Sequence, residues 1–440
     1  MRSSNIAPVL AAIASLAAVS ALACGGSPDP APKQNVEVVK SSLARDMAPV
    51  LTPTQLDTFS QDQAEFAVDL YHAVRKEPKS ANEDVFVSPH SVSIALAMTF
   101  AGARGETRDE MKKVLHYGLD DVSLHRSFDY LDLALASRGA GATAADGKPF
   151  RLKVANSIWG QKGTAFDAPF LDTLAVNYGA GLNVVDFVNN REASRLAING
   201  WVEDKTENRI KDLVPPDAIN DLTRLVLVNA VYFNAAWASK FAENGTEPAP
   251  FTKLDGSVAQ VPTMHLDGQL PYAKGDGYEA VELPYEGGET SMLVIAPTTG
   301  QFATFESSMT GGKVLAVMAG LKSEKVQLSF PKLQLDTTLS LKDPLIGLGM
   351  KQAFGRGADF SGMAPTLDLQ IKDVLHKTFL KVDENGTEAA AATAIIVGEK
   401  TSFDPSEPIA VKVDRPFVMA IVDRQTKTLV FLGRILAPKQ

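Results

Sequence analysis

Residues 225–237 read LVLVNAVYFNAAW and are apolar along almost their whole length, with Asn229 and Asn234 as the polar exceptions. A strand that is apolar on both faces is buried on both faces. The stretch therefore predicts the middle of a large sheet that is covered on each side. Asn229 should be hydrogen-bonded there, because an unpaired buried amide costs about 1–3 kcal/mol.

Helical patterns dominate the first half of the chain and strand patterns the second. Helices are predicted at residues 59–75, from Ser88-Pro89 to about 102, from a capping box at Thr107 and Glu110 to about 115, and at 198–206. Further strands are predicted at residues 280–283, 291–295, 326–330, 377–382, 409–413, 417–423 and 428–433. Helices early and strands late indicate an α+β domain.

Length and composition describe a globular protein with an ample core. The chain has 440 residues, of which 45% are hydrophobic, and a net charge of −9. Nucleic-acid binders usually carry a basic surface, so we expect no nucleic-acid partner.

The N-terminus has the pattern of a secretory signal peptide over residues 1–23. Arg2 precedes a mostly apolar run at 7–23, which is short and weak for a membrane span. An ordinary cut after Ala23 fits the pattern. The site also resembles a bacterial lipobox, which implies a lipid on Cys24, the only cysteine in the chain.

A lipid on Cys24 would hold the protein at a membrane surface without spanning it. We therefore expect an exported protein that is anchored to the bacterial cell envelope, or extracellular if released. Residues 24–54 begin with a Gly- and Pro-rich stretch and are predicted to be a flexible tether, followed by one domain at 55–440.

Enzyme and metal motifs are missing from the sequence. It has no G-x-S-x-G, no Walker loop and no H-E-x-x-H, and its six histidines show no close ligand spacing. We expect no catalytic residues, no metal and no cofactor. Considered alone, His376 is an interior histidine, and Ser88 and Ser91 are capping and packing residues.

Residues 383–402 read DENGTEAAAATAIIVGEKTS and combine helix-favouring alanines with β-branched residues. With strand periodicity, one face carries Thr387, Ala389 and Ala391 and no charge. Gly386 supplies a pivot, and the polar far end is the kind of exposed tip that proteases cut. Composition leaves two alternatives open, which are a strand that can enter a sheet and a surface helix followed by a loop.

Several motifs resemble the serpins, the serine protease inhibitor family. They are VFVSPHSVSIALAMTFAGARGETRDEM, NGWVEDKTENRIKDLV, LVLVNAVYFNAAWASKF, DVLHKTFLKVDENGTEAAAATA and DRPFVMAIVDRQTKTLVFLGRI, in family order. The resemblance covers about residues 56–440. It implies one serpin domain with a large central sheet, smaller sheets, about nine helices and an exposed reactive loop.

The resemblance also assigns roles to residues. It implies a loop hinge made of Glu384, Gly386, Thr387, Glu388, Ala389, Ala390, Ala391 and Ala392. It implies structural switch residues at Ser88, Ser91, Asn229, Trp237 and His376. Counting from the hinge glycine, it implies a reactive bond between Lys400 and Thr401, with cleavage nearby or after Phe403 as the alternatives.

The activity implied is protease inhibition rather than catalysis. The partner would be a serine protease, trypsin-like because of Lys400, held in a covalent complex by a monomeric inhibitor. The cleaved loop would enter the central sheet and trap the acyl-enzyme. The alternatives are a non-inhibitory binding or chaperone protein, and an inhibitor of cysteine or chymotrypsin-like proteases.

Overall fold

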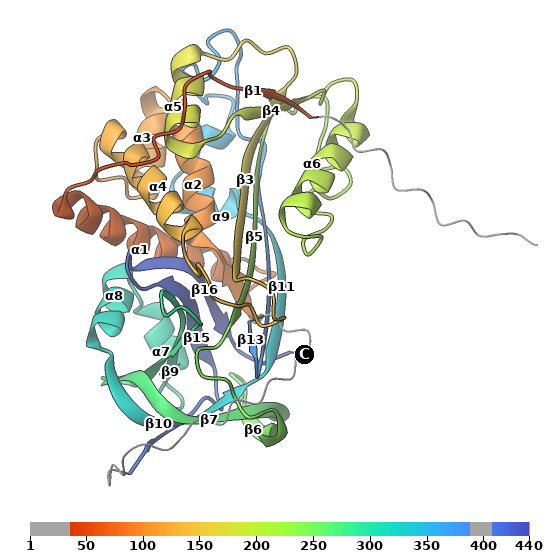
Figure 1. Ribbon diagram of the computed structural model, residues 1–440. Coiled ribbons are helices and arrows are strands. Elements are labelled where there is room, and N and C mark those ends of the chain that lie inside the picture. Colours follow the sequence, from red (N-terminus) through yellow and green to blue (C-terminus); the bar gives the residue numbers. More distant parts are fainter. Residues whose placement is uncertain (1–35, 388–406, 440) are drawn as a thin grey trace, which may run out of the picture. The chain divides into compact units, whose positions relative to one another are not determined.

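A computed structural model describes residues 36–387 and 407–439 (Figure 1). In these two ranges the chain forms nine α-helices, which confirms the predicted α+β class. They are α1 (Pro53–Lys76), α2 (Pro89–Phe100), α3 (Gly105–Val114), α4 (Asp121–Ala136), α5 (Ala168–Tyr178), α6 (Arg191–Lys205), α7 (Phe302–Ser307), α8 (Gly311–Gly320) and α9 (Lys342–Leu348). Two short 3₁₀ helices are η1 (Glu243–Gly245) and η2 (Gln352–Phe354).

A seven-stranded sheet contains the stretch on which the sequence analysis opened. Its strand order is β1-β4-β3-β5-β13-β12-β11. The strands are β1 (Glu37–Val39), β3 (Arg151–Gln161), β4 (Leu182–Val185), β5 (Leu225–Ala236), β11 (Leu333–Ser340), β12 (Val374–Asp383) and β13 (Gly386–Thr387). Every residue of β5 is buried, as its apolar sequence predicts.

The two faces of β5 pack into two different apolar clusters. Leu227, Val231 and Phe233 belong to the main core with α1 and α2, whereas Val226 and Val228 pack with residues of α6. Figure 1 shows α6 and the helix group of α2 to α5 on opposite sides of the sheet. The burial of both faces follows from this arrangement.

A second sheet of nine strands has the order β14-β10-β7-β8-β9-β15-β16-β2, with β6 paired to β7. Its strands are β2 (Val85–Val87), β6 (Glu247–Thr252), β7 (Val258–Gly275), β8 (Tyr278–Pro284), β9 (Thr290–Pro297), β10 (Lys322–Pro331), β14 (Ile409–Lys412), β15 (Phe417–Asp423) and β16 (Thr428–Ile435). All seven strands predicted in the second half of the chain are present in the two sheets.

The described part of the predicted tether, residues 36–54, is bound to the folded body, so the expectation of a flexible tether is wrong there. Strand β1 pairs antiparallel with β4 at the edge of the seven-stranded sheet. Arg45 forms 2.7 Å ion pairs with Asp129 and with Asp132 of α4. Backbone pairing at a sheet edge depends little on which side chains are present, so the composition of residues 24–54 does not predict the pairing of β1 with β4.

No helix in the described ranges is both long enough and apolar enough to cross a membrane. Residues 1–23 and Cys24, on which the signal and lipid predictions rest, lie outside these ranges.

Candidate functional site

Strand β13 lies inside the seven-stranded sheet, between the carboxyl-terminal ends of β5 and β12. After β12 the chain turns at Glu384 and Asn385, and Gly386 and Thr387 then pair antiparallel with both neighbours. Beyond this short strand, β5 and β12 pair directly with each other in parallel over six residue pairs. We call this direct contact between β5 and β12 the seam. The sheet is thus open by two residues at one end and closed along the seam.

Only glycine fits the backbone conformation and the close contact with β5 at position 386. Its φ is +154°, and a Cβ added there would lie 2.1 Å from the carbonyl oxygen of Ala235. Any side chain would push the chain away from β5. The glycine therefore lets the returning chain approach β5 closely enough to pair with it.

Thr387 is fully buried, and its hydroxyl lies 2.6 Å from the hydroxyl of Tyr285. The Tyr285 ring stacks on Trp237, with a centroid distance of 4.6 Å and an interplanar angle of 9°. The Trp237 indole Nε1–H donates to the carbonyl of Asp383 at 2.9 Å, and its backbone N–H donates to the carbonyl of Asn385. Trp237 therefore holds the turn that delivers Thr387 into the sheet.

Glu384 anchors the same turn through its side chain. Lys332 donates to its two carboxylate oxygens at 2.8 and 3.0 Å, and the Thr246 hydroxyl donates at 2.5 Å. Burial alone would raise the pKa of Glu384, but these hydrogen bonds outweigh it and hold the pKa below its ordinary value. The carboxylate thus stays ionised, and its ion pair with Lys332 connects this turn to the start of β11.

A cluster of polar side chains lies at the seam, among apolar neighbours. Asn229 of β5 is paired in register with Asn156 of β3 on one side and with His376 of β12 on the other. Its amide donates to Asn156 Oδ1 at 2.7 Å and to the Ser91 hydroxyl at 2.6 Å. Ser91 in turn donates to Asn156 at 2.7 Å. The buried amide expected from the sequence is therefore well paired.

His376 connects β12 to this cluster and to the start of α2. The backbone N–H of Ser88 donates to His376 Nε2 at 3.0 Å, so the proton of the neutral ring is on Nδ1, which faces Asn229 Oδ1. Ser88 is the N-cap of α2, and its hydroxyl donates to the carbonyl of Val430. Burial lowers the pKa of His376 to about 3, so the ring is neutral at physiological pH.

The structure thus brings the five expected switch residues to the seam and its open end. Ser88, Ser91, Asn229 and His376 are joined by hydrogen bonds, and Trp237 lies at the turn into β13. Of the hinge, Glu384, Gly386 and Thr387 are described. Outside the described residues lie Glu388, Ala389, Ala390, Ala391, Ala392, Lys400 and Thr401.

Four residues of this site were missed by the sequence analysis, and one of them, Thr246, lies 138 residues before Glu384. Asn156 was overlooked because the strand that carries it, β3, was not predicted. Tyr285 and Lys332 lie far from the hinge in sequence, and neither lies in a motif. A polar residue within an alternating apolar stretch was the available signal for Asn156.

A comparison with family models matches residues 61–438 to the serpin (serine protease inhibitor) family. An uncharacterized serpin-like protein of Thermococcus kodakarensis is 38% identical over 94% of this chain and 95% of its own length. A leukocyte elastase inhibitor of Bos taurus is 35% identical over 87% of this chain and 100% of its own.

The fold is also similar to solved structures. A thermophilic serpin, tengpin, in the native state has a TM-score of 0.79 and 26% identity, covering 92% of this chain and all of its own. Serpins are mostly protease inhibitors rather than enzymes, and they form complexes with target proteases. With a family match over most of its length, the chain belongs to the serpin family.

Proposed function

We propose that the protein is a suicide-type inhibitor of serine proteases. The observation that carries the proposal is β13, because Gly386 and Thr387 already lie as a strand between β5 and β12. This two-residue strand is the position from which insertion would begin. The seam ahead of it is closed by direct pairing of β5 with β12.

The chemistry of the first step belongs to the protease. Its serine oxygen attacks the carbonyl carbon of Lys400, the bond to Thr401 breaks, and the new amine of Thr401 leaves as an acyl-enzyme forms. The freed loop then extends β13 along the seam and carries the bound protease with it. Inhibition requires that insertion be faster than hydrolysis of the ester.

If the loop extends β13 as we propose, the register of Gly386 and Thr387 predicts which residues each loop residue would lie beside. Thr387 is opposite Ala235 on β5 and Val382 on β12. Continuing by two residues places Ala389 between Phe233 and Leu380. Continuing further places Thr393 between the seam residues Asn229 and His376. Small uncharged residues on this face fit the buried side of the sheet.

For the target we propose a trypsin-like serine protease, because the acidic pocket of such enzymes pairs with a lysine. The bond between Lys400 and Thr401 rests on counting from Gly386. Cleavage one or two bonds away, or after Phe403 by a chymotrypsin-like enzyme, would change the target class but not the trapping step.

Incubation with a panel of serine and cysteine proteases tests the proposal. We expect an SDS-stable complex with a trypsin-like enzyme and a released C-terminal peptide that begins at Thr401, as read by mass spectrometry. A loop that is cleaved by every protease tested, with no stable complex, would instead favour the non-inhibitory alternative. The thermal stability of the cleaved protein should rise if the loop inserts.

We also propose that the protein is exported and carries a lipid on Cys24. Expression in a bacterial host with labelled palmitate tests this separately. We expect label in the membrane fraction that disappears in Cys24→Ser. Unlabelled protein that begins at Cys24 in the periplasm or medium would instead indicate ordinary signal cleavage.

A further inference from the structure

The outer edge of the seven-stranded sheet, formed by β11, has an open row of backbone groups. On its inner side β11 pairs with β12 from Leu333 to Ser340. Gln334 N–H points the other way and donates to the carbonyl of Lys439 at 2.8 Å. By the two-residue period of a strand, Asp336, Thr338 and Ser340 also turn their N–H and C=O groups outward. Among the described residues, none of these three has a backbone partner on that side.

This edge forms one wall of a groove of about 500 Å³. The opposite wall is the connection between α1 and β2, residues 77–84, and Lys439 lies at one end. The edge from Gln334 to Ser340 is about 20 Å long, at about 3.3 Å per residue. The groove therefore has the length and the backbone groups to accept one extended segment.

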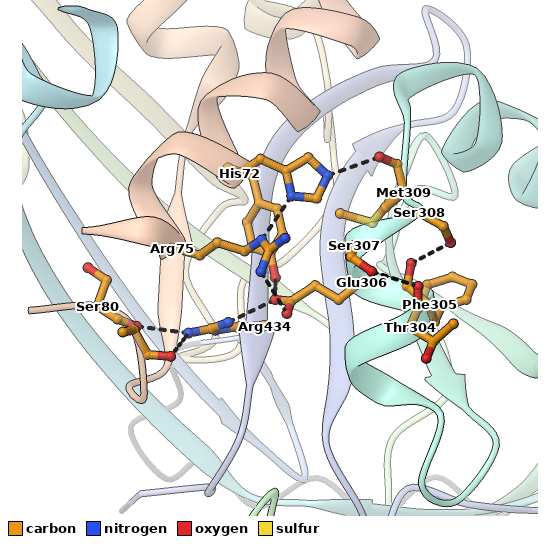
Figure 2. Close-up of polar contacts among 12 residues, drawn as sticks. His72, Arg75, Ser80, Thr304, Phe305, Glu306, Ser307, Ser308, Met309 and Arg434 are labelled. Atoms are coloured by element: carbon orange, nitrogen blue, oxygen red, sulfur yellow. Dashed lines mark hydrogen bonds and ion pairs between the residues drawn. The ribbon is translucent and has the colours of Figure 1, made fainter. Parts of the chain in front are cut away.

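A buried arginine holds the second wall in place. Arg434 is 3% exposed, and its guanidinium donates to the carbonyls of Ser80 and Ala81 at 2.8 Å and of Glu83 at 3.2 Å. Its other side forms a 2.9 Å ion pair with Glu306 of α7 (Figure 2). Because three backbone carbonyls are bound by one buried cation, the groove is formed before any ligand arrives.

The groove is acidic. Five carboxylates and two lysines line it, which leaves a net charge of −3; they are Glu77, Glu83, Asp84, Asp336 and Asp343 against Lys79 and Lys439. Lys439 is already paired with Glu83 at 2.7 Å, and Lys377 of β12 lies 3.8 Å from Asp336. With Lys377 counted the net charge is −2, so an occupant that brings positive charge is favoured and a second copy of this edge would bring further negative charge.

We propose that this groove binds an extended basic peptide segment of a partner protein, which adds to β11 as an eighth strand. The backbone of β11 would supply the hydrogen bonds, and the acidic rim would select lysine and arginine side chains. The seam lies between β5 and β12, on the inner side of β12. Occupation of the outer edge thus leaves the path of loop insertion free, and the inference does not depend on the inhibitory function.

Fluorescence anisotropy with a labelled peptide, acetyl-Lys-Val-Lys-Thr-Lys-Val-Lys-amide, tests the proposal on the whole protein. We expect saturable binding that is lost with the peptide in which every lysine is replaced by glutamate. A third peptide, methylated on every backbone nitrogen, keeps the charges but has no backbone donors, and it should also fail to bind. If it bound as well as the parent peptide, the attraction would be electrostatic only and strand addition would be excluded.

Variants of the protein locate the site. Asp336→Lys combined with Asp343→Lys should weaken binding by about tenfold or more at physiological salt. Thr338→Pro should also weaken it, because it removes an N–H that points out of the sheet. The matched control is Asp276→Lys combined with Asp255→Lys, two exposed acids in turns outside the groove lining, which changes the net charge equally and should bind as the parent does. Equal binding by all variants, or an edge-mediated dimer in sedimentation, would overturn the proposal.

Discussion

By the proposed mechanism, replacing Ala389 with arginine should convert the protein from an inhibitor into a substrate. Continuing the register of β13 places this side chain between Phe233 and Leu380, which are 1% and 0% exposed. An unpaired guanidinium buried there costs several kcal/mol. Taking about 4 kcal/mol, and about 1.4 kcal/mol for each factor of ten, insertion past this residue would slow about a thousandfold. Hydrolysis of the acyl-enzyme would then come first.

The assay is titration of a trypsin-like protease with Ala389→Arg, followed by SDS gels and measurement of residual activity. We expect loop cleavage at the parent bond, recovery of active protease and little stable complex. The matched control is Ser406→Arg, which adds the same charge after the reactive bond, outside the segment that inserts. The reasoning is refuted if Ala389→Arg forms stable complex as efficiently as this control.

Three further changes test the seam and the hinge. Asn229→Ala should lower the free energy of unfolding by about 1–3 kcal/mol, because Asn156 and His376 lose a buried partner; an unchanged urea midpoint would contradict this. His376 has a folded pKa of about 3, below its ordinary 6.5, so its contribution to stability is complete above about pH 6.5 and is lost as the pH falls toward 3. The free energy of unfolding should therefore be about 2 kcal/mol lower at pH 5 than at pH 8 because of His376. Urea unfolding at the two pH values measures this difference, which should be smaller in His376→Gln. Lys332→Ala should remove the ion pair with Glu384 and speed amide hydrogen exchange at residues 384–387, while exchange in β9 stays the same. Unchanged exchange at residues 384–387 would show that the ion pair does not stabilise this turn.

The sequence predicts secondary structure and burial correctly where a segment has a simple pattern of apolar residues or a clear helix cap. The stretch at 225–237 indicated a strand buried on both faces, and β5 is buried at every position. Asn229 could be expected to have partners, because a buried amide without them is costly. The start of α2 at Ser88-Pro89 was also correct, since Ser88 is its N-cap.

Predictions from short sequence motifs failed where a side chain bonds to residues far away in the sequence. Thr107 and Glu110 were predicted to cap a helix, but α3 begins at Gly105. The Thr107 hydroxyl instead accepts the N–H of Asp359, and Glu110 accepts the N–H groups of Lys351 and Gln352. These partners are 241, 242 and 252 residues away in sequence, so a window of four residues could not reveal them.

In the proposed mechanism the seam is closed before cleavage and opens for the loop, and the polar cluster lies where it would open. Asn229 donates to Ser91 and to Asn156, and His376 accepts the N–H of Ser88. The side-chain hydrogen bond between Asn229 and His376 is the link in this cluster that crosses the seam. Separation of β5 from β12 there would break this bond together with the backbone pairing of the seam. Because Ser88 and Ser91 both lie at the start of α2, it would also break either the bond from Asn229 to Ser91 or the bond from Ser88 to His376. Each buried polar group that loses its partner costs about 1–3 kcal/mol, so the cluster favours the closed seam until an inserting strand occupies the gap.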